Sequence, residues 1–136
     1  MAVILIVDDD PTVRLIAGEL LRGDDHAIVE AEDGNEALKI AGVLAVDLVV
    51  LDMLMPNKDG LETIVELRKL QPDIRILAIS SGGQMERGLL LRTAMVFGAD
   101  ESLQKPLRLE TFADTVTRLL SRPSKSLSMM QSARSS

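Results

Sequence analysis

Short apolar runs recur along the chain at residues 3–7, 26–31, 48–51 and 74–79. Each run is too short for an ordinary helix and is bounded by turn residues, which is typical of a β-strand. The run at 48–51 shows no alternation of polar and apolar residues, so we expect a strand that is buried on both faces. A shorter, weaker strand is predicted at 101–104.

Segments with apolar residues at helical spacing separate these runs. The first helix is predicted at 11–22, because Asp10 is a good N-cap residue and Pro11 suits the first helical turn. Asp33 and Glu36 have the spacing of a capping box and predict a second helix start. This second helix is predicted at 35–44. Further helices are predicted at 61–70, 85–97 and from about 109 to 120.

Five strands that alternate with five helices define an α/β fold. Such alternation implies right-handed crossovers and a parallel sheet that is covered on both faces, so we expect three layers. Residues 1–121 of the 136 are expected to form one domain. The serine-rich segment 122–136 is expected to be a disordered tail or linker.

Composition and charge narrow the possible functions. Hydrophobic residues make up 46% of the chain, yet Phe97 and Phe112 are its only aromatic residues, so the core must be aliphatic. The absence of cysteine excludes disulfides, thiolate metal sites and a cysteine nucleophile. A net charge of −6 argues against direct nucleic-acid binding. No secretory signal or membrane span is evident, so we expect a cytoplasmic protein that does not bind membranes.

Polar side chains follow four of the predicted strands. Asp8 and Asp9 follow the first, Asp52 the third, Ser80 the fourth and Lys105 the fifth. The carboxyl ends of parallel strands share one edge of the sheet, so the three carboxylates would repel one another unless a cation lay between them. Oxygen ligands without His or Cys favour a hard ion, and Mg²⁺ in particular.

These residues stand in motifs with a familiar order and spacing. The motifs are Ile6-Val7-Asp8-Asp9-Asp10, Leu51-Asp52-Met53-Leu54-Met55-Pro56-Asn57-Lys58-Asp59-Gly60, Ile79-Ser80-Ser81 and Lys105-Pro106. Over about residues 2–121 the sequence resembles the receiver domain of two-component response regulators. The resemblance implies a flavodoxin-like (βα)5 fold, a three-layer sandwich with the parallel strands in the order 2-1-3-4-5.

The same resemblance implies a role for each polar residue of the site. Asp52 would accept a phosphoryl group from a histidine kinase or a histidine phosphotransfer protein. Ser80 would hydrogen-bond this group and Lys105 would form an ion pair with it. The Mg²⁺ ligands would be Asp8, Asp9, Asp52 and the backbone carbonyl of Leu54.

By the same resemblance, the chain would not be an enzyme with a separate substrate, because it would catalyse only its own phosphorylation and dephosphorylation. Phosphorylation would switch the face formed by helix 4, strand 5 and helix 5. That face would bind a downstream protein or a second copy of the chain. Ser102 stands where many receivers carry Tyr or Phe on strand 5, so signalling here is expected to depend more on backbone movement.

A different class of function competes with this interpretation. Asp8 and Asp10 resemble the nucleophile and acid of haloacid-dehalogenase-type phosphatases, which makes a phosphatase with Asp8 as nucleophile the alternative. That interpretation leaves Asp52 unexplained, and no later acidic pair follows Lys105 to hold Mg²⁺. Asp10 is most simply a helix cap, and Arg14 most simply a solvated charge.

Overall fold

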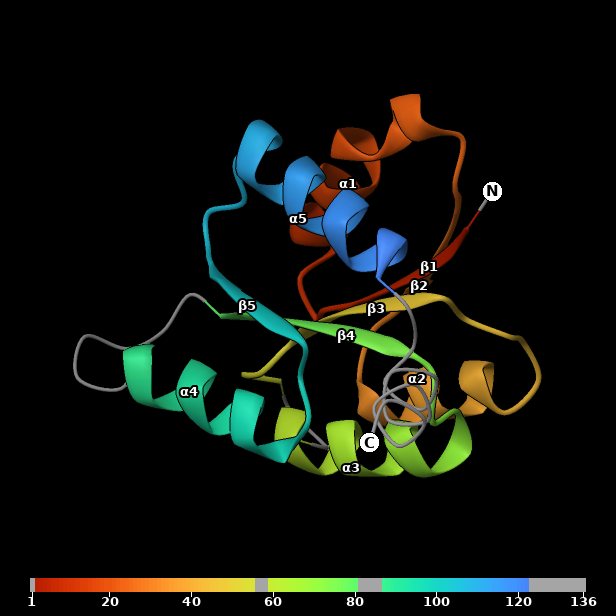
Figure 1. The fold of residues 1–136 in the computed structure, drawn as a ribbon, viewed down its shortest axis with the longest axis vertical. Coiled ribbons are helices and arrows are strands. Elements are labelled where there is room, and N and C mark those ends of the chain that lie inside the picture. The colour runs from red at the N-terminus through yellow and green to blue at the C-terminus, as the bar shows by residue number, and fades with distance from the viewer. Residues whose placement is uncertain (1, 56–58, 81–86, 123–136) are drawn as a thin grey trace, which may run out of the picture.

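A computed structural model describes residues 2–55, 59–80 and 87–122, and its centre is a five-stranded parallel sheet (Figure 1). The strands are β1 (Val3–Val7), β2 (Ala27–Ala31), β3 (Leu48–Asp52), β4 (Arg75–Ser80) and β5 (Glu101–Gln104). They are arranged in the order β2-β1-β3-β4-β5, and each neighbouring pair is parallel. The predicted strand order is thereby confirmed.

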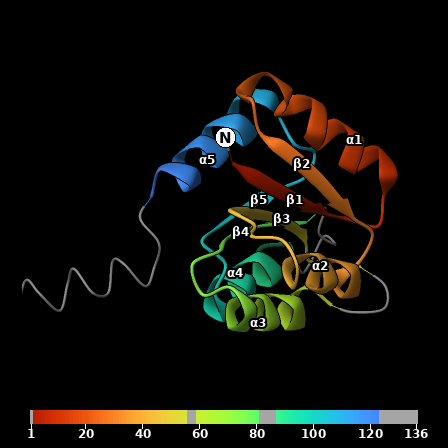
Figure 2. The same cartoon turned by 90° about the vertical axis from the view of Figure 1, so that its right-hand side faces the viewer.

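Helices cover both faces of the sheet. The helices are α1 (Pro11–Leu20), α2 (Gly34–Ala41), α3 (Gly60–Leu70), α4 (Arg87–Phe97) and α5 (Leu109–Ser121). In two perpendicular views α1 and α5 lie on one side of the sheet and α2, α3 and α4 on the other (Figures 1 and 2). This arrangement confirms the predicted three-layer α/β sandwich.

Aspartates cap three of the helices at their first turns. Asp10 accepts a hydrogen bond from the backbone N–H of Thr12, and Asp33 accepts one from that of Glu36, as the sequence predicted. Asp59 caps α3 in the same way. A cap of this kind is worth about 1 kcal/mol, because it satisfies an N–H that the helix leaves unpaired.

Two helices end earlier than their apolar patterns predicted. The first was predicted to reach residue 22, but it ends at Leu20 and a 3₁₀ turn (Arg22–Asp24) follows. The second was predicted to reach residue 44, but it ends at Ala41, where the Gln71 side chain donates to the carbonyls of Ala41 and Leu44. This tertiary contact replaces the helical hydrogen bonds. The predicted helix start at 85 and the tail from 123 lie outside the described residues.

The core is divided by the sheet into two apolar clusters. Successive side chains of a strand point to opposite faces, so alternate residues enter different clusters. In β3, Val49 and Leu51 pack toward α2, α3 and α4, whereas Leu48 and Val50 pack toward α1 and α5. By the same alternation, the side chain at position 52 belongs to the α1 and α5 side.

Candidate functional site

Three carboxylates meet where β1 and β3 end. The strand register pairs Val7 with Leu51, so Asp8 follows beside Asp52. Asp8 and Asp52 are buried, whereas Asp9 is exposed to solvent. Each of the three carboxylates offers one oxygen, and these oxygens all lie within 4.8 Å of one another. The structure thus brings the three predicted carboxylate ligands into one cluster.

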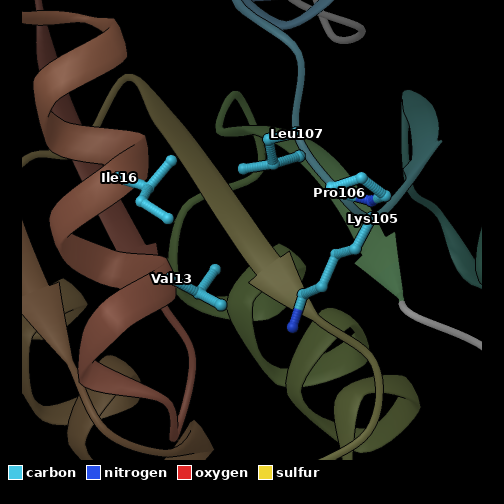
Figure 3. A pocket seen from close by; sticks show the side chains of 5 residues that line it. All are labelled: Val13, Ile16, Lys105, Pro106 and Leu107. Carbon is cyan, nitrogen blue, oxygen red and sulfur yellow. The ribbon is translucent and has the colours of Figure 1, made fainter.

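Lys105 supplies the positive charge that faces this cluster. Its Nζ atom lies 2.7 Å from Asp8 Oδ2 and 3.5 Å from Asp52 Oδ2. Figure 3 shows the side chain extending toward the tip of β3, beside an apolar pocket of about 330 Å³. Val13 and Ile16 of α1 line this pocket opposite the segment after β5, whose Lys105-Pro106 peptide is cis.

Ser80 ends β4 and is buried. Its backbone carbonyl accepts a hydrogen bond of 3.0 Å from the Lys105 N–H, which ties the end of β4 to the segment that carries the lysine. On the neighbouring strand, the N–H of Leu54 donates to Asp52 Oδ1 at 3.1 Å. The Leu54 carbonyl as a metal ligand stays a prediction.

Gly60 allows the chain after β3 to return closely to the site. A Cβ atom at this position would lie 2.8 Å from the Cα atom of Met53, closer than such atoms approach in proteins. Only glycine therefore fits here, at the first turn of α3. The first turn of α3 therefore packs directly against Met53, the residue that follows Asp52.

The site changes the proton affinity of two groups. Burial raises the pKa of Asp52 from 3.8 to about 6, and the Asp8 charge adds to this, while the Leu54 N–H and Lys105 act in the opposite direction. Burial alone would lower the pKa of Lys105, but its ion pairs with Asp8 and Asp52 outweigh burial and raise it. The Asp52 shift therefore reports mainly the burial of this carboxyl group, and the Lys105 shift reports the two carboxylates beside the ammonium.

The donor set fits a divalent cation. Asp8 Oδ1 accepts the N–H of Asp10 at 2.9 Å, whereas Asp8 Oδ2 is buried and has no hydrogen bond of good geometry among the described residues. The Lys105 ammonium balances only one of three clustered carboxylates. A hard ion with oxygen ligands and several retained waters, such as Mg²⁺, suits such an incompletely compensated cluster.

The raised pKa of Asp52 predicts a dependence of stability on pH. Between about pH 4 and pH 6, folded Asp52 retains a proton that the unfolded chain has released, so the free energy of unfolding should fall as pH rises through this window. Without metal, Asp52→Asn should therefore be more stable than the wild type by about 3 kcal/mol above pH 7. The difference should shrink toward pH 4 in urea unfolding followed by circular dichroism.

The exposed Asp9 provides the control for this measurement. Asp9→Asn removes a charge from the same cluster without removing a buried one, so it should stabilise the protein less. A gap between Asp52→Asn and the wild type that stayed constant from pH 4 to pH 8 would contradict the assignment of the shift to Asp52.

The sequence interpretation was wrong about Arg14. Its side chain is only 14% exposed. The guanidinium donates to the backbone carbonyl of Asp8 at 2.7 Å and to Glu30 Oε1 on β2 at 2.9 Å. One signal was available in the sequence, because Arg14 lies next to Val13 and so borders the apolar stripe of its helix.

The fold and the site together define a class of protein, the receiver domains of two-component signalling. The family model described as "Response regulator receiver domain" matches residues 4–117. The chain belongs to this family. The resemblance drawn from the sequence is thereby confirmed, and the phosphatase alternative is not supported: Asp8 is buried against Lys105, and Asp10 caps α1.

Curated relatives span the same domain. The chain is 31% identical over 117 residues to the chemotaxis protein CheY of Halobacterium salinarum, covering 86% of this chain and 95% of that protein. It is 35% identical over 119 residues to the response regulator MprA of Mycolicibacterium vanbaalenii, covering 88% of this chain and 50% of that protein. The chain thus spans about half the length of the MprA-type relatives.

Solved structures share the fold. The response regulator TrrA of Thermotoga maritima, solved in complex with Mg²⁺-BeF, is 35% identical with a TM-score of 0.75 and is covered to 99%, against 88% of this chain. A response regulator from Chloroflexus aurantiacus is 28% identical with a TM-score of 0.80, covering 89% of this chain and 98% of that one. In the described ranges, none of the helices is both long and apolar enough to span a membrane.

Proposed function

We propose that Asp52 is the phospho-acceptor of this receiver domain and that the Asp8, Asp9 and Asp52 carboxylates hold Mg²⁺. One observation carries the proposal: the Lys105 ammonium lies within ion-pair distance of two buried carboxylates in a cluster of three. The Mg²⁺-BeF complex of TrrA supports the choice of metal, because that receiver is similar in sequence and fold.

Phosphoryl transfer depends mainly on the positions of the reacting groups and on the compensation of their charges. A carboxylate oxygen of Asp52 attacks the phosphorus of the donor's phosphohistidine; the new P–O bond forms as the P–N bond breaks, and the imidazole leaves with the electron pair. Mg²⁺, held by the three aspartates and the Leu54 carbonyl, would offset negative charge on the phosphoryl oxygens. Lys105 then pairs with those oxygens and the Ser80 hydroxyl donates to them. Hydrolysis of the acyl phosphate returns Asp52 to its free form.

Receiver domains interact with histidine kinases or histidine phosphotransfer proteins, and we propose such a donor for this chain. The pocket of about 330 Å³ lies directly beside Lys105. Leu15 and Ile16 of α1 are 63% and 45% exposed, which extends the apolar surface next to the acceptor. This surface would let a donor dock with its phosphohistidine close to Asp52.

For the output we propose the face formed by α4, β5 and α5, which would bind a downstream protein or a second copy of the chain. Leu89 and Val96 of α4 are 58% and 83% exposed. Glu101 of β5 binds both Arg118 and Arg122, which gives the face charged groups that can exchange partners. We place the end of the receiver unit at 121, the last residue of α5.

Intact-mass spectrometry after treatment with acetyl phosphate tests the proposal. The wild type should gain one phosphoryl group with Mg²⁺ present and none in excess chelator, because three uncompensated carboxylates repel an anionic donor. Peptide mapping should place the group on Asp52. Labelling that persisted without divalent metal, or that mapped to Asp8, would contradict the proposed site.

A further inference from the structure

Arg14 connects helix α1 to the loop that carries two of the proposed metal ligands. Its guanidinium is held between Glu30 Oε1 on the edge strand β2 and the backbone carbonyl of Asp8. The Asp8 N–H is held as well, because it donates to the carbonyl of Ala31 at 3.1 Å. Both backbone polar groups of Asp8 are therefore anchored, one of them by a nearly buried side chain.

The anchored carbonyl determines where the next residue points. The peptide group between Asp8 and Asp9 is planar, so the direction of the Asp8 carbonyl also fixes the Asp9 N–H and Cα. The Asp8 side chain pairs with Lys105 and accepts a hydrogen bond from the Asp10 N–H, whose position depends on the peptide that precedes Asp9. Asp9 is exposed, and neighbouring side chains restrain its carboxylate least among the three in the cluster.

We propose that Arg14 is a positioning residue, which holds the peptide between Asp8 and Asp9 so that the Asp9 carboxylate joins the metal cluster. The proposal rests on the proposed Mg²⁺ site, but it concerns the geometry of the loop. The fork of the guanidinium suits this role, since it donates from two nitrogens to partners on β2 and on the loop after β1. Glu30 in turn holds the guanidinium in place.

The charge of Arg14 and its positioning role predict opposite changes in Mg²⁺ affinity when the residue is replaced. Arg14 is a cation close to a cation site, so its removal should strengthen Mg²⁺ binding if charge were all that mattered. Loss of position should weaken it, because an Asp9 carboxylate that samples several directions must be ordered when the metal binds. The sign of the change in Mg²⁺ affinity therefore separates the two explanations.

The test compares three variants of the full chain. Arg14→Met keeps the apolar stem and removes all donors, and Arg14→Lys keeps the charge without the fork. Arg22→Met is the matched control, because Arg22 pairs with Glu19 on the protein surface and lies in the 3₁₀ turn that follows α1. Mg²⁺ affinity is measured by titration followed in ¹⁵N NMR spectra, and amide hydrogen exchange at Asp10 is measured without metal.

Arg14→Met should bind Mg²⁺ about tenfold more weakly than the wild type, as for other residues that orient metal ligands. Arg14→Lys should recover part of the loss, and Arg22→Met should bind as the wild type does. The Asp10 N–H, which bonds to Asp8 Oδ1, should exchange faster in Arg14→Met.

Equal or tighter Mg²⁺ binding by a folded Arg14→Met protein would overturn the positioning role. If Arg14→Met did not fold, the test would rest on Arg14→Lys. Wild-type Mg²⁺ affinity and wild-type Asp10 exchange in that variant would contradict the positioning role. A wild type that bound no Mg²⁺ would instead refute the proposed function. In that case, unchanged exchange of the Asp10 amide would still refute the role of Arg14.

Discussion

Asp52→Asn is expected to abolish phosphorylation by acetyl phosphate in the presence of Mg²⁺. The amide has no anionic oxygen to attack phosphorus, and it removes one of the two buried carboxylates of the cluster. Intact-mass spectrometry should show a gain of one phosphoryl group for the wild type and none for the variant. We expect the loss to be complete, because Asp8 Oδ1 is engaged by the Asp10 N–H and Oδ2 faces Lys105.

The same experiment has a matched control in Asp59→Asn. Asp59 caps α3 through its side chain, and asparagine caps a helix about as well, so this Asp-to-Asn change should leave both fold and labelling intact. Labelling of Asp52→Asn at the wild-type rate would show that another residue accepts the phosphoryl group. The Asp8 nucleophile of the phosphatase alternative predicts that result.

Much of the fold could be predicted because its signals are local in the sequence. Apolar runs placed four of the five strands, and Asp10 and Asp33 cap their helices as expected. Helix ends were harder to predict. The end of α2 depends on the side chain of Gln71, which lies thirty positions from Ala41 in the sequence. No pattern within the helix itself reports such a contact.

The sequence predicted which polar residues would come together, but not which of them would be buried. The ends of parallel strands share an edge, so the sequence could bring Asp8, Asp52 and Lys105 together. That Asp8 is buried and Asp9 exposed follows from strand register and alternation, which depend on the neighbouring strand. The position of Arg14 depends on Glu30, and β2 brings that residue near only in the folded protein.

Replacing Lys105 is expected to strengthen metal binding and to slow phosphoryl transfer. With Lys105→Met the cluster loses the cation that lies 2.7 Å from Asp8 Oδ2, so Mg²⁺ no longer competes with an ammonium and should bind several-fold more tightly. Labelling by acetyl phosphate should nevertheless slow by about 100-fold at saturating Mg²⁺, because the loss of one charged partner of the transferring group typically costs this much.

Saturating Mg²⁺ is essential for this comparison, since a buried carboxylate that has lost its partner destabilises the metal-free fold. Lys69→Met, at an exposed position of α3, is the control and should label as the wild type does. Lys105→Arg keeps the charge but replaces a compact ammonium by a planar guanidinium, so it should restore little activity. If Lys105→Met labelled within a few-fold of the wild-type rate, the lysine would serve only to balance Asp8 in the metal-free protein. Tighter Mg²⁺ binding together with slow labelling would instead show that one ammonium first offsets the carboxylates and then stabilises the phosphoryl group.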